Sequence, residues 1–214
     1  MGREQWNSTG SMDSWLSIIA FSPATNKLFF IAAGPIAFIH YILFLEAGSV
    51  YSIGGSNLSN NGAGFVNGTP SNVRYRNPRG LACDTAGIIY VADCDNHAIR
   101  KIDLAANVST LAGNGTAGYA DGTGSIARFN NPCGVACDSL DNVYVADTGN
   151  NRIRKITPAG VVTTIAGAGE ADYADGSLAT AEFNNPQGLW VNPSGKIIYV
   201  ADSGNKCVRR IDLK

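Results

Sequence analysis

Carboxylate, amide and guanidinium side chains recur at a fixed spacing between residues 93 and 209 of this 214-residue chain. In each copy an Asp is followed three residues later by Asn and seven residues later by Arg. Short Asx side chains bond to the backbone of tight turns, so the Asp and Asn are interpreted as hairpin residues. The Arg is interpreted as the ion-pair partner of a neighbouring Asp, and its stem as cover for apolar surface. The sets are Asp93, Asn96 and Arg100; Asp147, Asn150 and Arg154; and Asp202, Asn205 and Arg209.

Groups that could carry out catalysis or bind a metal ion are scarce. The two histidines, His40 and His97, lie in no arrangement with a Ser or Cys nucleophile. The five cysteines show no CxxC spacing, which argues against a zinc site, and this odd, scattered set is interpreted as reduced thiols. The sequence therefore predicts no catalytic residue, no cofactor and no metal ligand, and it favours a protein that is not an enzyme.

These polar sets belong to a repeat of 54 residues. The strings YVADCDNHAIRKID, YVADTGNNRIRKIT and YVADSGNKCVRRID begin at Tyr90, Tyr144 and Tyr199, and the third copy contains one extra residue near Lys196. A regular period of this length predicts a fold built from repeated supersecondary units. Residues that recur in every copy are expected first of all to be needed for folding.

Each unit is predicted to contain four short strands. An Asn-Pro-x-Gly motif precedes two apolar runs separated by a turn, and two further runs rich in β-branched residues follow, again bounded by turn residues. Helical periodicity is absent. Four antiparallel strands per unit are typical of a propeller blade, which must pack against its neighbours. The unbroken apolar run at residues 88–91 fits a strand that is covered on both faces.

These residues resemble the NHL-repeat family in its long-loop variety. The matching positions in one unit are Asp121, Gly122, Ala127, Phe129, Pro132, Gly134, Ala136, Asp138, Tyr144 to Asp147, Asn150, Ile153 to Ile156, Gly160, Val162, Thr164, Ala166 and Gly167. The resemblance is strong over residues 64–214 and weak over about 16–63. It implies an all-β propeller, usually of six blades, that most often serves as a binding platform.

Some members of the family are enzymes, and the resemblance therefore leaves a second hypothesis. A metal-dependent hydrolase or lyase of the six-bladed type would need several His ligands or a central set of Glu, Asn and Asp. The sequence has two His and no identifiable set of that kind. Other relatives are receptor ectodomains, which becomes relevant near the N-terminus.

Residues 28–45 contain no Asp, Glu, Lys or Arg, a length and purity that would suit a transmembrane helix. That alternative describes a membrane-anchored, receptor-like ectodomain, for which five Asn-x-Ser/Thr sequons would be available. The favoured hypothesis is a degenerate first blade. Its signature Asp is replaced by Ala33, the turn Asn by Ile36, and the basic pair by His40 and Tyr41. Gly34 and Pro35 would then form the hairpin turn.

The sequence therefore predicts an incomplete propeller of about four blades. The expected boundaries are a disordered segment at residues 1–14 and an arc at 15–214, with blades at about 16–55, 76–113, 130–167 and 184–214, the last one incomplete. An open arc would expose an unpaired strand and apolar faces. The chain is expected to be a fragment of a longer propeller, to close a ring by self-association, or to persist as an open arc.

The connections between blades are the predicted partner-binding surfaces, because propellers place variable residues in loops. Aligned residues in the connections at 113–131 and 167–185 are the candidates, namely Tyr119, Asp121, Tyr173 and Asp175. The alternative role for these segments is packing between blades, with Phe129 and Phe183 at the seams.

The expected partner is another protein. The net charge of -1 and the pI of 6.1 argue against nucleic acid. The scattered thiols favour an intracellular protein, whereas the sequons favour a membrane-anchored or extracellular one.

Overall fold

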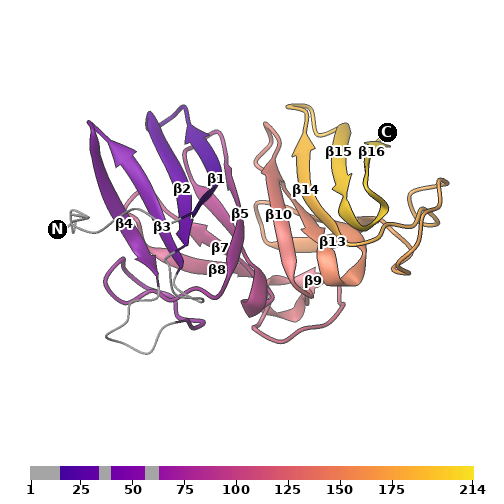
Figure 1. Ribbon diagram of the computed structural model, residues 1–214, viewed down its shortest axis with the longest axis horizontal. Coiled ribbons are helices and arrows are strands. Elements are labelled where there is room, and N and C mark those ends of the chain that lie inside the picture. Colours follow the sequence, from indigo (N-terminus) through magenta and orange to yellow (C-terminus); the bar gives the residue numbers. More distant parts are fainter. Residues whose placement is uncertain (1–14, 34–39, 56–62) are drawn as a thin grey trace.

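The computed structural model describes residues 15–33, 40–55 and 63–214, which form an all-β arc of four antiparallel sheets (Figure 1). Each sheet is one blade, and blades 1 to 4 follow one another along the chain. This confirms the predicted fold class, an unclosed propeller. The expected disorder at 1–14 and the expected hairpin turn at Gly34 and Pro35, with Ile36, lie outside the described residues.

Every blade is a meander in which strands consecutive in sequence are hydrogen-bonded neighbours. Short apolar runs bounded by Gly, Asn, Asp or Pro favour this arrangement. The last blade has three strands, as expected from the sequence. The strands are β1 (Trp15–Ser22), β2 (Lys27–Ala33), β3 (His40–Glu46) and β4 (Ser49–Gly55); β5 (Pro78–Cys83), β6 (Ile89–Asp93), β7 (Ala98–Ile102) and β8 (Val108–Ala112); β10 (Pro132–Cys137), β11 (Val143–Asp147), β12 (Arg152–Ile156) and β13 (Val161–Ala166); and β14 (Pro186–Val191), β15 (Ile197–Asp202) and β16 (Cys207–Asp212).

Short elements complete blades 2 to 4. Strand β9 (Gly122–Thr123) adds a fifth strand to blade 3 by pairing with β13, and η3 (Gly124–Ile126) follows it. A single 3-10 turn joins the second and third strands of blades 2, 3 and 4. These turns are η2 (Cys94–Asn96), η4 (Thr148–Asn150) and η5 (Ser203–Asn205).

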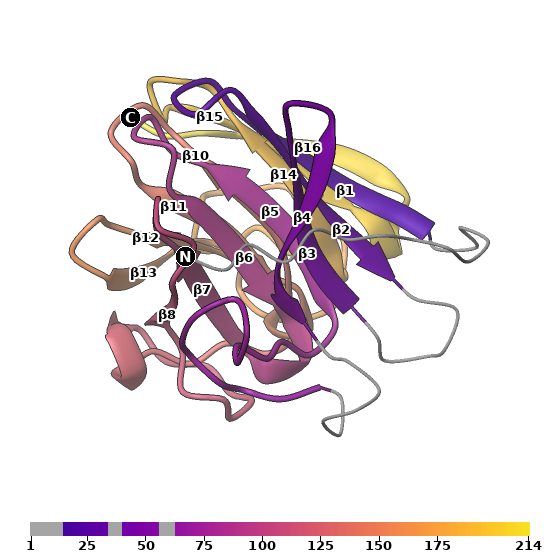
Figure 2. The same ribbon diagram turned by 90° about the vertical axis from the view of Figure 1, so that its left-hand side faces the viewer.

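The apolar stretch at 28–45 forms strands. β2 pairs with β3 from Leu28 opposite Leu45 to Ala33 opposite His40, and Figure 2 shows the resulting sheet from its own side of the molecule. The alternative of a membrane-spanning helix at 28–45 is therefore wrong for this structure. Among the described residues, no helix has the length and hydropathy needed to cross a membrane.

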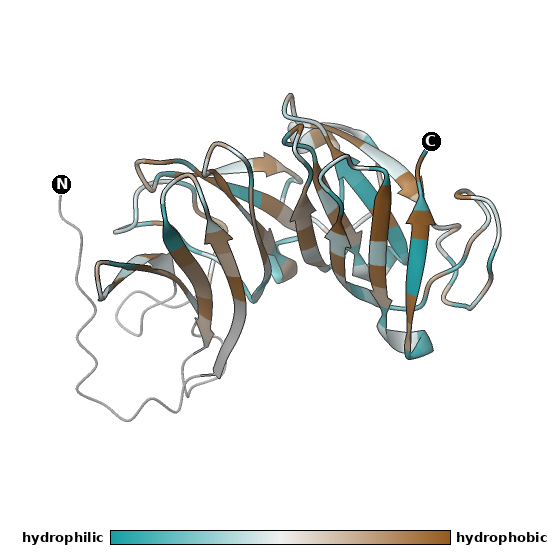
Figure 3. Cartoon of the chain, turned by 90° about the horizontal axis from the view of Figure 1, so that it is seen from above, coloured by the Kyte–Doolittle hydropathy of each residue, from teal (hydrophilic) through white to brown (hydrophobic). Residues whose placement is uncertain are grey.

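The three largest core clusters lie in the seams between neighbouring blades, because a four-stranded sheet cannot bury both of its own faces. Figure 3 shows apolar residues concentrated on the strands. The seam between blades 2 and 3 contains Tyr90, Ile99, Phe129, Val145 and Ile156, among others. Equivalent clusters lie between blades 1 and 2 and between blades 3 and 4.

The first strands of neighbouring blades lie side by side, and a glycine permits their close approach. A Cβ atom on Gly134 of β10 would overlap the carbonyl oxygen of Gln187 in β14, and one on Gly80 would overlap that of Cys133. Neither glycine has a positive φ, so the requirement is for space rather than for backbone conformation. This explains the Gly in the repeated Asn-Pro-x-Gly motif.

Candidate functional site

The repeated Asp closes the second strand of its blade and accepts three hydrogen bonds. In blade 2 the Oδ2 atom of Asp93 accepts from Arg100 Nη1 at 2.7 Å and from Asn96 Nδ2 at 2.8 Å. Its Oδ1 atom accepts from the backbone N–H of Arg76 at 2.7 Å. Because Asp93 and Arg100 are both fully buried, these bonds replace the water that each charge loses on folding.

Blades 3 and 4 repeat this network. The Asp147–Arg154 pair is 2.7 Å apart and the Asp202–Arg209 pair 3.2 Å, and Asn150 and Asn205 donate to the same carboxylates. The ion pair that the sequence predicted is thus present in all three repeats. The Asp directly precedes the 3-10 turn and the Asn is its last residue, as expected for hairpin residues.

Burial shifts the titration of these carboxyl groups. It raises the pKa of Asp93 to about 6, although Arg100, Asn96 and the backbone N–H of Arg76 favour the charged form. The pKa of Asp147 is raised for the same reason. Because its pKa is raised, Asp93 becomes protonated, and the ion pair loses its charge, at a higher pH than for an exposed Asp.

Each buried guanidinium is also flanked by two aromatic rings from the connection that precedes its blade. The Arg154 Cζ atom lies 5.0 Å from the centre of the Tyr119 ring and 5.1 Å from that of Phe129. Distances of this size are typical of cation–π contacts. The equivalent pairs are Phe65 and Tyr75 around Arg100, and Tyr173 and Phe183 around Arg209.

The connecting loop also binds the arginine through oxygen atoms. Arg154 Nη2 donates to the carbonyl oxygen of Ala120 and to Asp121 Oδ1, both at 2.7 Å. Asp121 in turn accepts from Thr164 Oγ1 at 3.1 Å. We call this unit the arginine latch, meaning the buried Arg of the third strand with its Asp, its two rings and its loop oxygens. The latch fastens residues 113–131 to blade 3.

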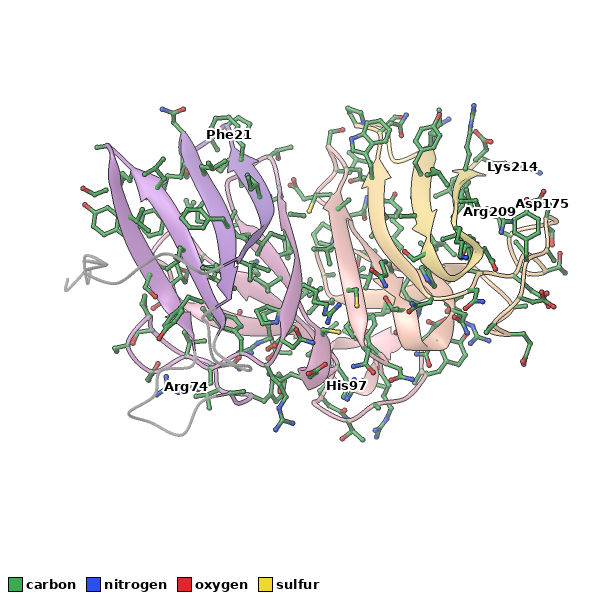
Figure 4. All side chains as sticks on the ribbon, viewed as in Figure 1. Phe21, Arg74, His97, Asp175, Arg209 and Lys214 are labelled. Atoms are coloured by element: carbon green, nitrogen blue, oxygen red, sulfur yellow. The ribbon has the colours of Figure 1, made fainter. Side chains whose placement is uncertain are left out.

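The predicted partner-binding residues lie on the outside of two latches. Tyr119 and Tyr173 are 47% and 55% exposed, so each contacts a buried Arg and keeps about half of its surface in solvent. Asp121 is half exposed and Asp175 largely exposed. Figure 4 shows Asp175 beside Arg209 at the outer side of blade 4.

Phe129 and Phe183 lie in the apolar seams, where they are almost fully buried. Within each pair, the Phe therefore packs between the blades, which was the alternative role for these segments, and the Tyr contacts solvent. The sequence did not indicate that both rings flank an arginine. The signal was the spacing of ten residues between the rings of each pair, which recurs from Phe65 to Tyr75.

Groups for metal chemistry do not gather in the described part of the chain. No three His, Cys, Asp or Glu side chains there are placed to share a metal ion. His97 Nδ1 accepts a hydrogen bond from the backbone N–H of Asn131 at 3.1 Å, and burial lowers the pKa of His97. This histidine therefore connects blade 2 to the start of blade 3.

The blades, the apolar seams between them and their adjacent first strands define an open β-propeller arc. Solved structures have the same fold. They include a protein of unknown function from Bacteroides thetaiotaomicron (TM-score 0.71, 20% identity, 93% of this chain and 47% of that one) and an auxiliary nutrient binding protein from Bacteroides ovatus (0.67, 21%, 91% and 47%). A gluconolactonase from Xanthomonas campestris is similar too (0.63, 14%, 94% and 59%).

The repeat itself identifies the family. The NHL repeat model matches residues 75–102, 129–156 and 183–211, the segments that carry the buried Arg, its Asp and the second ring of each latch, and the chain belongs to the NHL-repeat family. NHL repeat-containing protein 2 from Bos taurus is 33% identical over 162 residues, or 69% of this chain and 22% of that protein. Protein SUPPRESSOR OF QUENCHING 1, chloroplastic, from Arabidopsis thaliana is 29% identical over 206 residues, or 91% and 19%. The chain thus spans about a fifth of the length of these relatives.

Proposed function

We propose that this chain is a non-enzymatic binding module whose interblade loops bind another protein. One observation carries the proposal: Tyr119 and Tyr173, at the same position of successive repeats, are half exposed and held against buried arginines. The NHL-repeat fold supports the general class, a binding or scaffold module.

Rigid aromatic side chains are effective anchors for protein partners. Tyr, Trp and Arg dominate the binding energy of protein interfaces, and a side chain that is already ordered loses little entropy on binding. Tyr119 is ordered by the guanidinium groups of Arg152 and Arg154 and by a 3.1 Å hydrogen bond to Thr164 Oγ1. The exposed part of Tyr119 is therefore available to a partner at low entropic cost.

The charge beside the rings indicates the kind of partner. The exposed carboxylates of Asp121 and Asp175 adjoin Tyr119 and Tyr173, and each keeps part of its surface in water. A partner surface with an apolar pocket for a tyrosine ring and a Lys or Arg at its rim would match this arrangement.

The enzymatic alternative is a metal-dependent hydrolase or lyase. The likeness to a gluconolactonase supports a shared fold, and at 14% identity it supports nothing more. Metal analysis of the purified protein and an assay with a lactone test this alternative. Stoichiometric Ca²⁺ or Zn²⁺, or lactone turnover, would contradict the binding module.

Site-specific photocrosslinking tests the binding surface. A photoreactive phenylalanine placed at position 119 or 173, in the protein expressed in its native cells, should crosslink to the same partner from both positions. The matched control is Leu140 on the β10–β11 hairpin, which is more exposed than either tyrosine. Crosslinking that is equal at all three positions, or absent from both loops, would overturn the proposal. A product of twice the chain mass would identify the partner as a second copy.

A further inference from the structure

Two thiols from neighbouring blades face each other at the seam between blades 2 and 3. Cys94 begins η2 and Cys133 is the second residue of β10, and their Sγ atoms lie 3.4 Å apart. The residues are 3% and 9% exposed. A disulfide bond needs about 2.05 Å, so the sulfurs would have to approach by only about 1.3 Å. Figure 4 places His97, which follows η2, at this junction.

We propose that Cys94 and Cys133 form a redox-active pair, which a peroxide closes into a disulfide that joins blade 2 covalently to blade 3. This inference is independent of the proposed partner-binding loops. A small oxidant is required because both sulfurs are nearly buried.

The reaction proceeds in two balanced steps. The Cys133 thiolate attacks one oxygen of hydrogen peroxide, the O–O bond breaks, and the released hydroxide takes up a proton to become water. Cys133 is then a sulfenic acid. Cys94 attacks that sulfur, loses its own proton and displaces a second water as the S–S bond forms. Two thiols thus lose two electrons and two protons, and peroxide is reduced to two waters.

The surroundings favour Cys133 as the attacking sulfur. A hydrogen bond from the Cys94 thiol lowers the pKa of Cys133, and the positive charge of Arg79 acts in the same direction against burial. The hydrogen bond to Cys133 and burial raise the pKa of Cys94. The thiolate is the reactive form of cysteine. Cys133 is therefore the sulfur that attacks the peroxide, and Cys94 is the sulfur that attacks the resulting sulfenic acid.

Asn131 holds both sulfurs in place. Its carbonyl oxygen lies 3.4 Å from Cys133 Sγ, and its Nδ2 atom lies 3.9 Å from Cys94 Sγ. Nδ2 also donates to Asp95 Oδ1 at 3.2 Å, which ties Asn131 to η2. The pair is therefore positioned from both blades.

The next seam has no thiols at the equivalent positions. Thr148 and Gln187 stand there, 54 residues after Cys94 and Cys133, and Thr148 Oγ1 donates to the carbonyl oxygen of Pro186 at 2.6 Å. The seam between blades 3 and 4 thus has a hydrogen bond at the position where the seam between blades 2 and 3 has the two thiols. Oxidation would consequently stiffen one seam selectively.

Peptide mapping of the full chain tests the proposal. In a C83A/C137A/C207A variant, trypsin leaves Cys94 in the peptide 80–100 and Cys133 in the peptide 129–152. After hydrogen peroxide treatment, these peptides should be linked and the chain should be two hydrogen atoms lighter. The melting temperature should rise by roughly 5–10 °C, since the bond closes a loop of some forty residues. Dithiothreitol should reverse both changes.

Matched variants and the wild-type chain decide the outcome. C94S or C133S in the same background should abolish the link and the thermal shift. The same experiment on the wild-type chain controls for a folding defect of the triple variant. There, fragmentation of the linked peptides shows which cysteines form the bond. Sulfinic or sulfonic acid on Cys133 or a link between two chains would overturn the proposal. So would two free thiols after a peroxide dose that oxidises the urea-unfolded chain.

Discussion

Blades 3 and 4 carry equivalent residues at the same repeat positions, yet they bury them differently. Ile153 of blade 3 is 0% exposed, whereas its counterpart Val208 in blade 4 is 70% exposed. Tyr144 and Tyr199 differ in the same way, at 0% and 40%. Blade 4 covers this face of blade 3, and no described residue covers the same face of blade 4 to a similar extent. The repeat thus sets the residue, and the neighbouring blade sets its burial.

The arginine latch behaves differently, because it is the same in both blades. Arg154 and Arg209 each bind an Asp of their own blade, two rings and the oxygens of the preceding loop. The latch therefore depends only on one blade and the loop before it, whereas a seam depends on the packing of two blades. Four pairs of substitutions test this distinction, from the largest expected effect to the smallest.

Removal of the latch arginine should be costly in both blades. Arg154→Met leaves the carboxylate of Asp147 buried without its charge partner, and we expect a loss of about 3–5 kcal/mol in the free energy of unfolding. Arg209→Met likewise leaves the buried carboxylate of Asp202 without its charge partner and should cost a similar amount. Urea denaturation gives both values. A negligible loss at Arg209 would show that the latch requires a following blade.

Truncation of equivalent apolar residues should destabilise blade 3 much more than blade 4. Ile153→Ala leaves a cavity between blades 3 and 4 and should cost about 2–4 kcal/mol. Val208→Ala removes exposed surface and should change stability by less than about 0.5 kcal/mol. Thermal unfolding followed by circular dichroism compares them. Equal losses would mean that the face of blade 4 is covered in solution.

Addition of one methyl group to the inner strands should have the same asymmetry. Gly134→Ala forces a Cβ atom into the backbone of β14, and we expect a loss of about 1–3 kcal/mol. At Gly188 the nearest atom to an added Cβ is the Cβ of Ala201 at 3.7 Å, so Gly188→Ala should change stability by less than about 0.5 kcal/mol. Amide hydrogen exchange in β10 and β14 would localise the effect. A large loss at Gly188 would contradict the role assigned to close strand approach.

Removal of one hydroxyl group should have the smallest effect. The hydroxyl of Tyr144 lies 3.0 Å from Asp138 Oδ2 and 3.2 Å from the carbonyl oxygen of Gly195 in blade 4. Tyr144→Phe should therefore cost about 1 kcal/mol. Tyr199 is 40% exposed and its hydroxyl interacts only with the exposed Arg210 among the described residues, so Tyr199→Phe should cost less than about 0.5 kcal/mol. Guanidinium titrations resolve such a difference, and an equal cost at both sites would refute the comparison.

Much of the fold could be predicted from the sequence because strand patterns and turn residues act locally. The Asn-Pro-x-Gly and Val-Ala-Asp motifs marked the strands of blades 2 to 4. At residues 28–45 local pattern left a choice, since loss of the polar signature made two strands resemble one apolar helix. Pairing of β2 with β3 decided it, and that pairing joins residues that are far apart in sequence, such as Leu28 and Leu45.

The candidate site was predicted less completely. The sequence indicated Tyr119, Asp121, Tyr173 and Asp175 as surface residues, and it indicated an ion pair for each Arg. It did not show that the two features are one unit, because the loop residues and the Arg are more than 25 positions apart. The Cys94–Cys133 contact was missed as well, since it joins blades across 39 residues.

By itself, the sequence determined the repeat, the four-stranded unit and the positions of its polar residues, because each depends on neighbours within a few residues along the chain. Tertiary structure decided which of those residues are buried, which rings flank a guanidinium and which two thiols meet. The physical reason is that burial and side-chain contact depend on the packing of one blade against the next, and a repeated sequence assigns the same residues to a covered face and to an open one.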